Sequence, residues 1–358
     1  MNFVALPRRP AYVSHLPHAS IRKPGHASRM PAPTRRLGDP VVSRRPWLED
    51  DAAFQLGWDH AHHGQRPALD ALAKHPLLKN GYQTGVAVFG RRTLRAGPAT
   101  QAWLAVRLQA LEQGRTFDIE QVNPRYLEQL DSGWCPVTRQ PVRLLALPQN
   151  ASATVVTFPH AVLARLRPEA GDVPGHLVVL SRTAWLSMSR LSGDHRLDAD
   201  QRARLDTLRS FVDPLDHDVA RRIPLRVLPP NRLHLRNHAQ ALQAVVSRAL
   251  AQGPGGRGFS ALRAAHADAA WRDNLEAFAN VFENALLEAS DSLVFADQAR
   301  AQRAGPAMLQ AWAIGDAWRS PRLMQWWLML TAGLTPSDCE AIVERCVGEV
   351  GLVVGRQD

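Results

Sequence analysis

The sequence has few cysteines and no long apolar run, and both features narrow the class of protein. Among its 358 residues only Cys135, Cys339 and Cys346 are cysteines, and such an odd, sparse set argues against a disulfide framework and for a reducing compartment. No stretch approaches the ~18 consecutive apolar residues of a membrane-spanning helix, and the N-terminus lacks the apolar segment of a secretory signal. We therefore expect a soluble, cytoplasmic protein with no membrane partner. Cys339 and Cys346 are expected to be small buried side chains rather than metal ligands.

Lysine is also scarce, and the positive charge is unevenly distributed. Three of the 43 basic residues are lysines, and the formal net charge is +10. Residues 1–50 hold nine Lys and Arg against three Asp and Glu, which leaves 34 against 30 in the rest of the chain. The body of the protein is thus nearly balanced in charge. The arginine bias fits either phosphate binding or a genomic coding habit, and composition alone does not separate them.

The first 46 residues are predicted to form a disordered basic tail. Seven prolines between positions 7 and 40 prevent a sustained helix, and no apolar period persists. Such a tail contacts DNA or RNA through charge alone, and a solubilising extension without a partner is the alternative. The candidate nucleic-acid contacts are Arg8, Arg9, Arg22, Lys23, Arg35, Arg36, Arg44 and Arg45.

The rest of the chain is predicted to be mainly α-helical, with one small α+β segment in the middle. Residues 47–115 have helical spacing and contain a weak internal echo, in which Gly57 and Gly81 each precede an aromatic residue; this pattern predicts a helical hairpin. Residues 116–190 contain short runs at 142–147, 154–158 and 177–180 that are typical of strands. Residues 191–358 are predicted to form a helical domain, with helices near 198–211, 231–250 (capped by Asn231), 259–289, 296–318 and 321–332 and a final helix after Thr335.

The α+β segment resembles the finger of HNH-type, or ββα-metal, endonucleases over residues 135–190. The resemblance rests on Cys135-Pro136-Val137-Thr138-Arg139 and on Gly175-His176-Leu177, which precedes a predicted strand. It implies a ββα-like fold, a histidine that activates water and a divalent ion on the scissile phosphate. His160 and His176 are the candidate catalytic residues. The Asp-His pair of the family is not recognisable, and His176 stands where the family has Asn, so the resemblance implies a dismantled metal site.

A second cluster of candidate ligands lies in the first helical region. Asp59 and His63 are four residues apart and share a helix face, and His60 and His62 are their neighbours. His and Asp at this spacing suit Zn²⁺ or a similar ion. A polar, solvated helix face is the alternative interpretation.

Several common catalytic motifs are missing. The sequence has no Gly-x-Ser-x-Gly nucleophile elbow, no HExxH pair, and no Gly-Lys-Ser/Thr ending on its glycine-rich segment at 253–258. That segment is predicted to be a linker. Trp326 and Trp327 lie in an apolar helix and point about 100° apart, so at most one is expected in the core, and they are candidates for a partner-binding or self-association surface.

Together these features favour a degenerate HNH-like protein that binds nucleic acid or a nucleoprotein partner without nuclease activity. One alternative is a scaffold protein that contacts other proteins through its C-terminal Trp-rich helices. Another is a metal-dependent hydrolase or nuclease. No cofactor is expected, and a divalent metal only if the protein is an active nuclease.

Overall fold

The computed structural model describes residues 46–144, 157–158, 161–189, 197–229, 236–253 and 255–350, with the backbone alone for 46–50 and 157–158. The eight basic residues proposed to contact nucleic acid lie outside the described residues, as does His160. By its internal contacts the chain divides into residues 1–45 and residues 46–358. The described part is mainly helical with one small antiparallel sheet, which confirms the predicted fold class.

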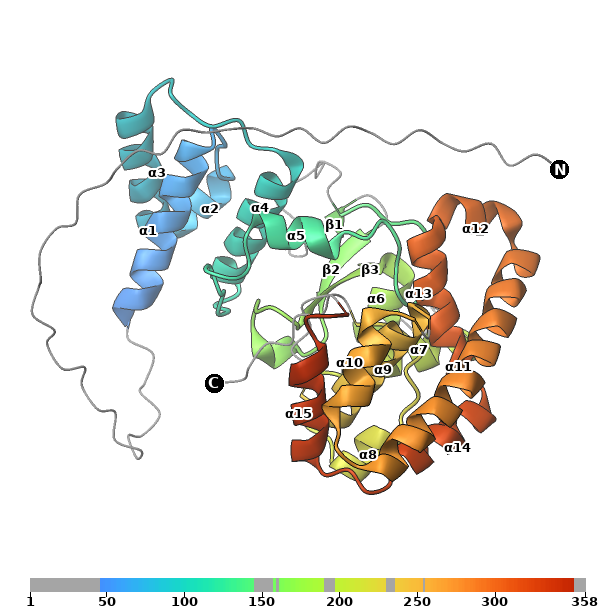
Figure 1. Cartoon of the computed structure of the whole chain (residues 1–358). Helices are drawn as coiled ribbons and strands as arrows, with labels where there is room; N and C mark the ends of the chain where they lie inside the picture. Colours follow the sequence, from blue (N-terminus) through green and yellow to red (C-terminus); the bar gives the residue numbers. More distant parts are fainter. Residues whose placement is uncertain are drawn as a thin grey trace, which may run out of the picture. The chain divides into compact units, whose positions relative to one another are not determined.

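The first four helices form the region in which a helical hairpin was predicted. They are α1 (Pro46–His62), α2 (Leu69–Lys74), α3 (Pro76–Phe89) and α4 (Pro98–Glu112). Helices α1 and α3 pack directly on each other (Figure 1). A Cβ atom on Gly57 would clash with the carbonyl oxygen of Leu78, and one on Gly81 with that of Phe54. The two glycines therefore allow the helix backbones to touch.

The sheet lies in the middle of the chain and has the strand order β1-β2-β3. Its strands are β1 (Thr157–Phe158), β2 (Ala161–Arg165) and β3 (Leu177–Ser181), and both strand pairs are antiparallel. The short helix α5 (Pro124–Leu130) precedes the sheet, the 3₁₀ turn η1 (Pro168–Ala170) joins β2 to β3, and α6 (Arg182–Ser189) follows β3 directly. Every residue of β3 is buried.

Two strand predictions need correction. The described part of the predicted strand at 142–147, residues 142–144, is irregular, and only an isolated bridge pairs Trp134 with Pro141 nearby. Strand β2 was not predicted, because alanine and arginine make its sequence a poor strand former. It forms because all five of its residues pair with β3, from Ala161 opposite Ser181 to Arg165 opposite Leu177.

Nine further helices complete the described part of the chain. They are α7 (Ala199–Ser210), α8 (His217–Arg221), α9 (His238–Ala251), α10 (Arg257–Ala265), α11 (Ala269–Ala296), α12 (Gln298–Ala304), α13 (Pro306–Ala317), α14 (Pro321–Leu330) and α15 (Pro336–Cys346). Helices α9, α10 and α15 lie side by side, and the long α11 packs on α13 and α14 (Figure 1). Among the described residues, no helix has both the length and the apolar character needed to cross a membrane.

Capping residues explain where these helices start and stop. Asp198 and Thr335 form the capping boxes of α7 and α15, as the sequence predicted for Thr335. The predicted helix at 259–289 is two helices, because Asp268 caps the start of α11. The predicted helix at 296–318 is also two, because Gly305 adopts a left-handed φ of 77° and Pro306 starts α13.

One hydrophobic core extends from α1 to the end of α15. Its most aromatic part contains Phe278 and Phe282 of α11, Trp318 at the end of α13 and Trp327 of α14, with Trp318 and Trp327 edge to face at 5.6 Å. The predicted segments 47–115, 116–190 and 191–358 share this core.

Candidate functional site

A tight turn at Cys135 opens the segment in which an HNH-like finger was predicted. The Cys135 N–H donates to the carbonyl of Gln140 at 2.9 Å, and the Arg139 N–H donates to the carbonyl of Cys135 at 2.8 Å. The Thr138 N–H points at the Cys135 sulfur at 3.4 Å. Arg139 has a φ of 53°, a left-handed conformation that glycine adopts most easily. The backbone thus forms a knuckle-like turn around one buried thiol.

Three arginines hold this turn in place. Arg139 belongs to the turn, and the other two come from distant helices. The Arg139 guanidinium forms a two-pronged ion pair with Asp316 of α13, at 2.7 and 2.8 Å. Arg204 of α7 donates from Nε to the carbonyl of Val137 at 2.7 Å. Arg300 of α12 donates to the carbonyls of Thr138 and Arg139, at 3.2 and 2.5 Å. Hydrogen bonds from guanidinium groups and one ion pair therefore stabilise the turn.

Strands β2 and β3 and helix α6 follow the turn in the order strand, strand, helix. The Thr138 hydroxyl donates to the Ser181 Oγ at 3.1 Å, which joins the turn to the end of β3, and Ser181 Oγ accepts the Ala184 N–H at 3.3 Å in the first turn of α6. His176 lies in the turn before β3, is 7% exposed, and its carbonyl accepts the Leu166 N–H at 2.8 Å. Its proposed partner His160 is outside the described residues, so their relation stays a prediction.

Two of the four predicted metal ligands at the end of α1, Asp59 and His62, contact other residues. Asp59 forms an ion pair with Arg107 of α4 at 2.5 Å. His62 stacks on Phe89 with ring centroids 4.5 Å apart. His60 is buried, and burial, together with the charge of Arg107, lowers its pKa to about 4. Burial also lowers the pKa of His63. Across the described ranges, no group of three or more His, Cys, Asp or Glu is placed to hold a metal ion.

The two tryptophans proposed as a contact surface differ in burial. Trp327 is fully buried and donates its indole N–H to the carbonyl of Arg221 at 3.0 Å, so its side chain cannot touch a partner. Trp326 is half-buried against the core. Cys339 and Cys346 are free and buried, and burial raises their pKa values to about 12 and about 11. They are inert thiols, as expected.

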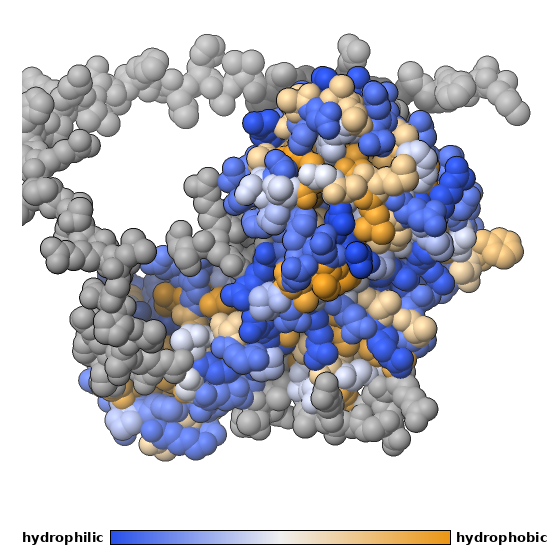
Figure 2. Space-filling model, turned by 90° about the horizontal axis from the view of Figure 1, so that it is seen from below, coloured by the Kyte–Doolittle hydropathy of each residue, from blue (hydrophilic) through white to orange (hydrophobic). Residues whose placement is uncertain are grey.

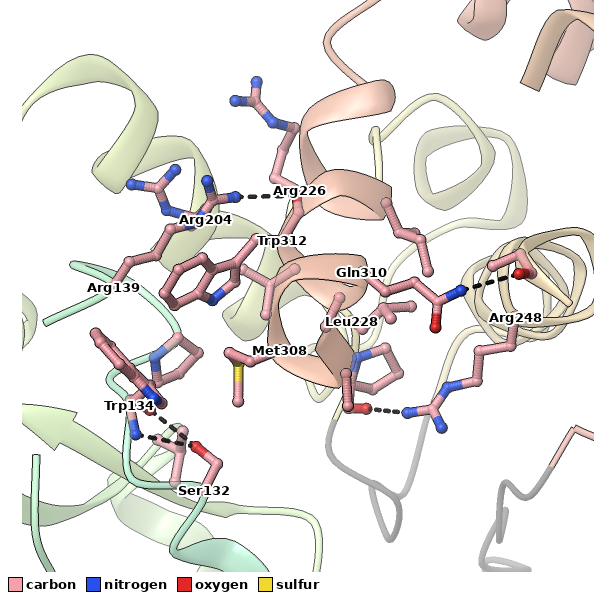
Figure 3. Close-up of a pocket in the computed structure, with 18 of the residues that line it drawn as sticks. Ser132, Trp134, Arg139, Arg204, Arg226, Leu228, Arg248, Met308, Gln310 and Trp312 are labelled. Carbon is pink, nitrogen blue, oxygen red and sulfur yellow. Dashed lines mark hydrogen bonds between the residues drawn. The ribbon is translucent and has the colours of Figure 1, made fainter. Parts of the chain in front are cut away.

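A cavity of about 530 Å³ beside the Cys135 turn was not predicted from the sequence. Trp134 and Trp312 lie at one side with Arg139 and Arg204, and Arg248 lies at the other, with Met308 between (Figure 3). The two indole rings meet edge to face, with centroids 5.2 Å apart. The cavity lies where α13, the end of α9, the Cys135 turn and the 226–229 segment meet.

The charges around this cavity are of one sign. Arg139, Arg204, Arg226 and Arg248 line it, and no Asp or Glu does. Arg139 and Arg226 are neutralised by Asp316 and Asp200, which lie outside the lining. Burial, together with Arg139, lowers the pKa of Arg204 to about 10, and burial lowers the pKa of Arg248. Both remain protonated at neutral pH.

The sequence gives little sign of this cavity. Trp134 is next to Cys135, but Arg204, Arg248 and Trp312 lie far along the chain and have no distinctive spacing. Only the tertiary packing of α7, α9 and α13 brings them together.

The face in Figure 2 carries its hydrophobic residues in small groups among hydrophilic ones.

Comparisons with known proteins do not identify a family. No protein-family model, curated protein or solved structure is significantly similar to the chain. The functional argument therefore rests on the chemistry of the described residues.

Proposed function

We propose that this protein binds nucleic acid through a degenerate HNH-like unit and does not cleave it. The observation that carries the proposal is the tight turn at Cys135 followed by β2, β3 and α6, with arginine side chains donating to the carbonyls of the turn. A turn and a ββα unit in this order support the resemblance. The basic residues of segment 1–46 add a source of phosphate contacts.

The proposal assigns no catalytic step to the unit. Phosphodiester hydrolysis by this family needs a general base and a divalent ion on the scissile phosphate. Within the described residues Arg204 and Arg300 bring positive charge to the Cys135 turn, and positive charge there disfavours a divalent cation and favours a phosphate. This arrangement suits a binding function better than a hydrolytic one.

The basic tail is the part of the proposal that is tested first. We expect the full chain to bind DNA or RNA with an affinity that falls with salt, by about 0.9 log units per tenfold salt for each neutralised phosphate on duplex DNA. Replacing the eight candidate basic residues of the tail by Gln keeps the length of the tail and leaves Arg29 as its one remaining Lys or Arg. This variant should show a flatter salt dependence in fluorescence anisotropy titrations between 50 and 200 mM salt, about the range over which such contacts are lost.

Two results contradict the proposal. Salt-independent binding, or no binding at low salt, would remove the nucleic-acid function and favour the scaffold alternative. Cleavage of plasmid DNA or RNA in the presence of Mg²⁺, Mn²⁺ or Zn²⁺ would show an intact nuclease. The variants His160→Ala and His176→Ala, assayed beside the unaltered protein, identify whether such cleavage belongs to the HNH-like segment.

A further inference from the structure

The cavity beside the Cys135 turn has the features of a ligand site. Its volume of about 530 Å³ falls within the ~300–1,000 Å³ of small-molecule sites, which are mostly apolar with a few polar groups. The apolar part includes Leu228, Met308 and Ile314, and Trp134 is half-buried at one side. Ser132 and Gln310 also line it and supply polar atoms (Figure 3).

Two of the lining arginines lack an anionic partner. Arg204 is 7% exposed and donates from Nε to the Val137 carbonyl at 2.7 Å, and neither of its terminal amino groups is hydrogen-bonded to another described residue. Asp316, Asp200 and Asp198 act on it at longer range, but no carboxylate of the described residues is within ion-pair distance. Terminal amino groups that are not bonded to a described residue can donate to an anion in the cavity.

Arg248 provides the second unpartnered cation, on the opposite side of the cavity. One of its terminal amino groups donates to the carbonyl of Pro229 at 3.0 Å, and its buried Nε has no hydrogen-bond partner among the described residues. Among the described residues, no carboxylate lies within ion-pair distance of Arg248 either. The cavity thus combines a flat aromatic side chain, an apolar lining and two cations that face no lining carboxylate.

We infer that this cavity binds a nucleoside phosphate, with the base against Trp134 and the phosphate on Arg204 or Arg248. A planar base is the natural partner of a half-exposed indole, and base–aromatic stacking tolerates any base. A phosphate supplies the acceptor oxygens that guanidinium donors need. This inference rests on the proposed function, which it deepens: a cavity of this size holds one nucleotide, so the base it takes must be unpaired.

Two sources supply this chemistry, a free nucleotide and an unpaired nucleotide within a strand. The full-length protein is titrated with AMP, UMP, adenosine and inorganic phosphate by calorimetry. It is also titrated with a labelled 12-residue oligothymidylate and with a duplex by fluorescence anisotropy. Nucleotide binding that exceeds the binding of adenosine and of phosphate is expected. Preference for the single strand over the duplex identifies the strand as the source, whereas tight binding of mononucleotides alone identifies the free nucleotide.

The variants Trp134→Leu and Arg248→Gln test the cavity itself. Each is expected to weaken nucleotide or single-strand binding by roughly tenfold to a hundredfold, the range for losing one stacked base or one charge-assisted contact. Arg303→Gln is the matched control, because Arg303 is an exposed arginine outside the lining that also donates to a backbone carbonyl, that of Ala299. It should bind as the unaltered protein does. Met308→Glu places an anion inside the cavity and should abolish binding. This variant keeps the test informative if Trp134→Leu does not fold.

The outcomes separate the inference from the proposed function. Strand binding that none of the cavity variants weakens overturns the inference and leaves the proposed function standing on the tail and the HNH-like unit. The absence of both nucleotide and strand binding overturns the two together. Equal effects of Arg303→Gln and Arg248→Gln would show a general loss of charge and would also overturn the inference.

Discussion

At the scale of single residues, His60 is a buried titratable group with a strongly lowered pKa. It is 6% exposed, and neither ring nitrogen has a hydrogen-bond partner among the described residues. Asp59, His63 and Arg107 are the charged or titratable groups around it, and the pKa of His60 falls from the usual 6.5 to about 4. Between about pH 6.5 and about pH 4, the imidazole of His60 is therefore neutral in the folded protein and protonated in the unfolded chain.

This shift predicts an acid-dependent loss of stability. As the pH falls from about 6.5 to about 4, the unfolded chain takes up a proton that folded His60 refuses, so the free energy of unfolding decreases by roughly 3 kcal/mol. Below the folded pKa the loss stops. His60→Leu should remove most of this dependence in urea denaturation at pH 7 and pH 4.5. The half-exposed His75, changed to Leu as a control, should leave it intact; an unchanged pH dependence in His60→Leu would refute the assignment.

At the scale of elements, the contact between α1 and α3 depends on residues that have no side chain. A Cβ atom at Gly81 would overlap the carbonyl oxygen of Phe54 on the facing helix. The two helices must separate to accept it, and the contacts around Gly57 and Gly85 are lost with them. Close backbone approach is thus the reason why glycine is present inside α3.

Gly81→Ala should therefore destabilise the protein although alanine is the better helix former. Alanine normally gains about 0.5–1 kcal/mol over glycine in a helix, but overpacking a close contact costs about 1–3 kcal/mol. We expect a net decrease of roughly 1–2 kcal/mol in the free energy of unfolding. Gly333→Ala is the control, since a Cβ atom there meets no atom within 4 Å and the glycine does not have a positive φ. Equal stability of the two variants would mean that the helices tolerate separation.

The elements also show which features local sequence determines. The helix starts at Ser320 and Thr335 follow from side-chain caps, because each hydroxyl accepts the N–H of a residue three positions later. The helical hairpin follows from glycine and aromatic spacing. Strand β2 does not, because its pairing with β3 decides its conformation. The cavity was missed for the same reason, since Arg204, Arg248 and Trp312 meet only after α7, α9 and α13 have packed. Trp327 was misjudged because an apolar helix indicates burial but not which side is buried.

At the scale of the whole molecule, the Cys135 turn and the C-terminal helices are parts of one structure. The ion pair of Arg139 with Asp316 joins residues far apart in the chain, and the two side chains are 9% and 13% exposed. Arg300 and Arg204 add hydrogen bonds from two more helices to the same turn. The single core that runs from α1 to α15 predicts that residues 46–350 unfold together.

Asp316→Ala tests this coupling because it leaves the buried Arg139 guanidinium without its carboxylate. Removing one partner of a buried ion pair costs about 3–5 kcal/mol, so we expect one cooperative transition at a clearly lower temperature, with the calorimetric and van't Hoff enthalpies equal. Glu276→Ala removes the exposed pair with Arg263, whose side chains are 50% and 53% exposed, and should change stability by less than about 1 kcal/mol. If Asp316→Ala instead splits the transition in two, the HNH-like unit is a separate folding unit. A module that folds on its own would then carry the proposed nucleic-acid binding without the helices that complete its cavity.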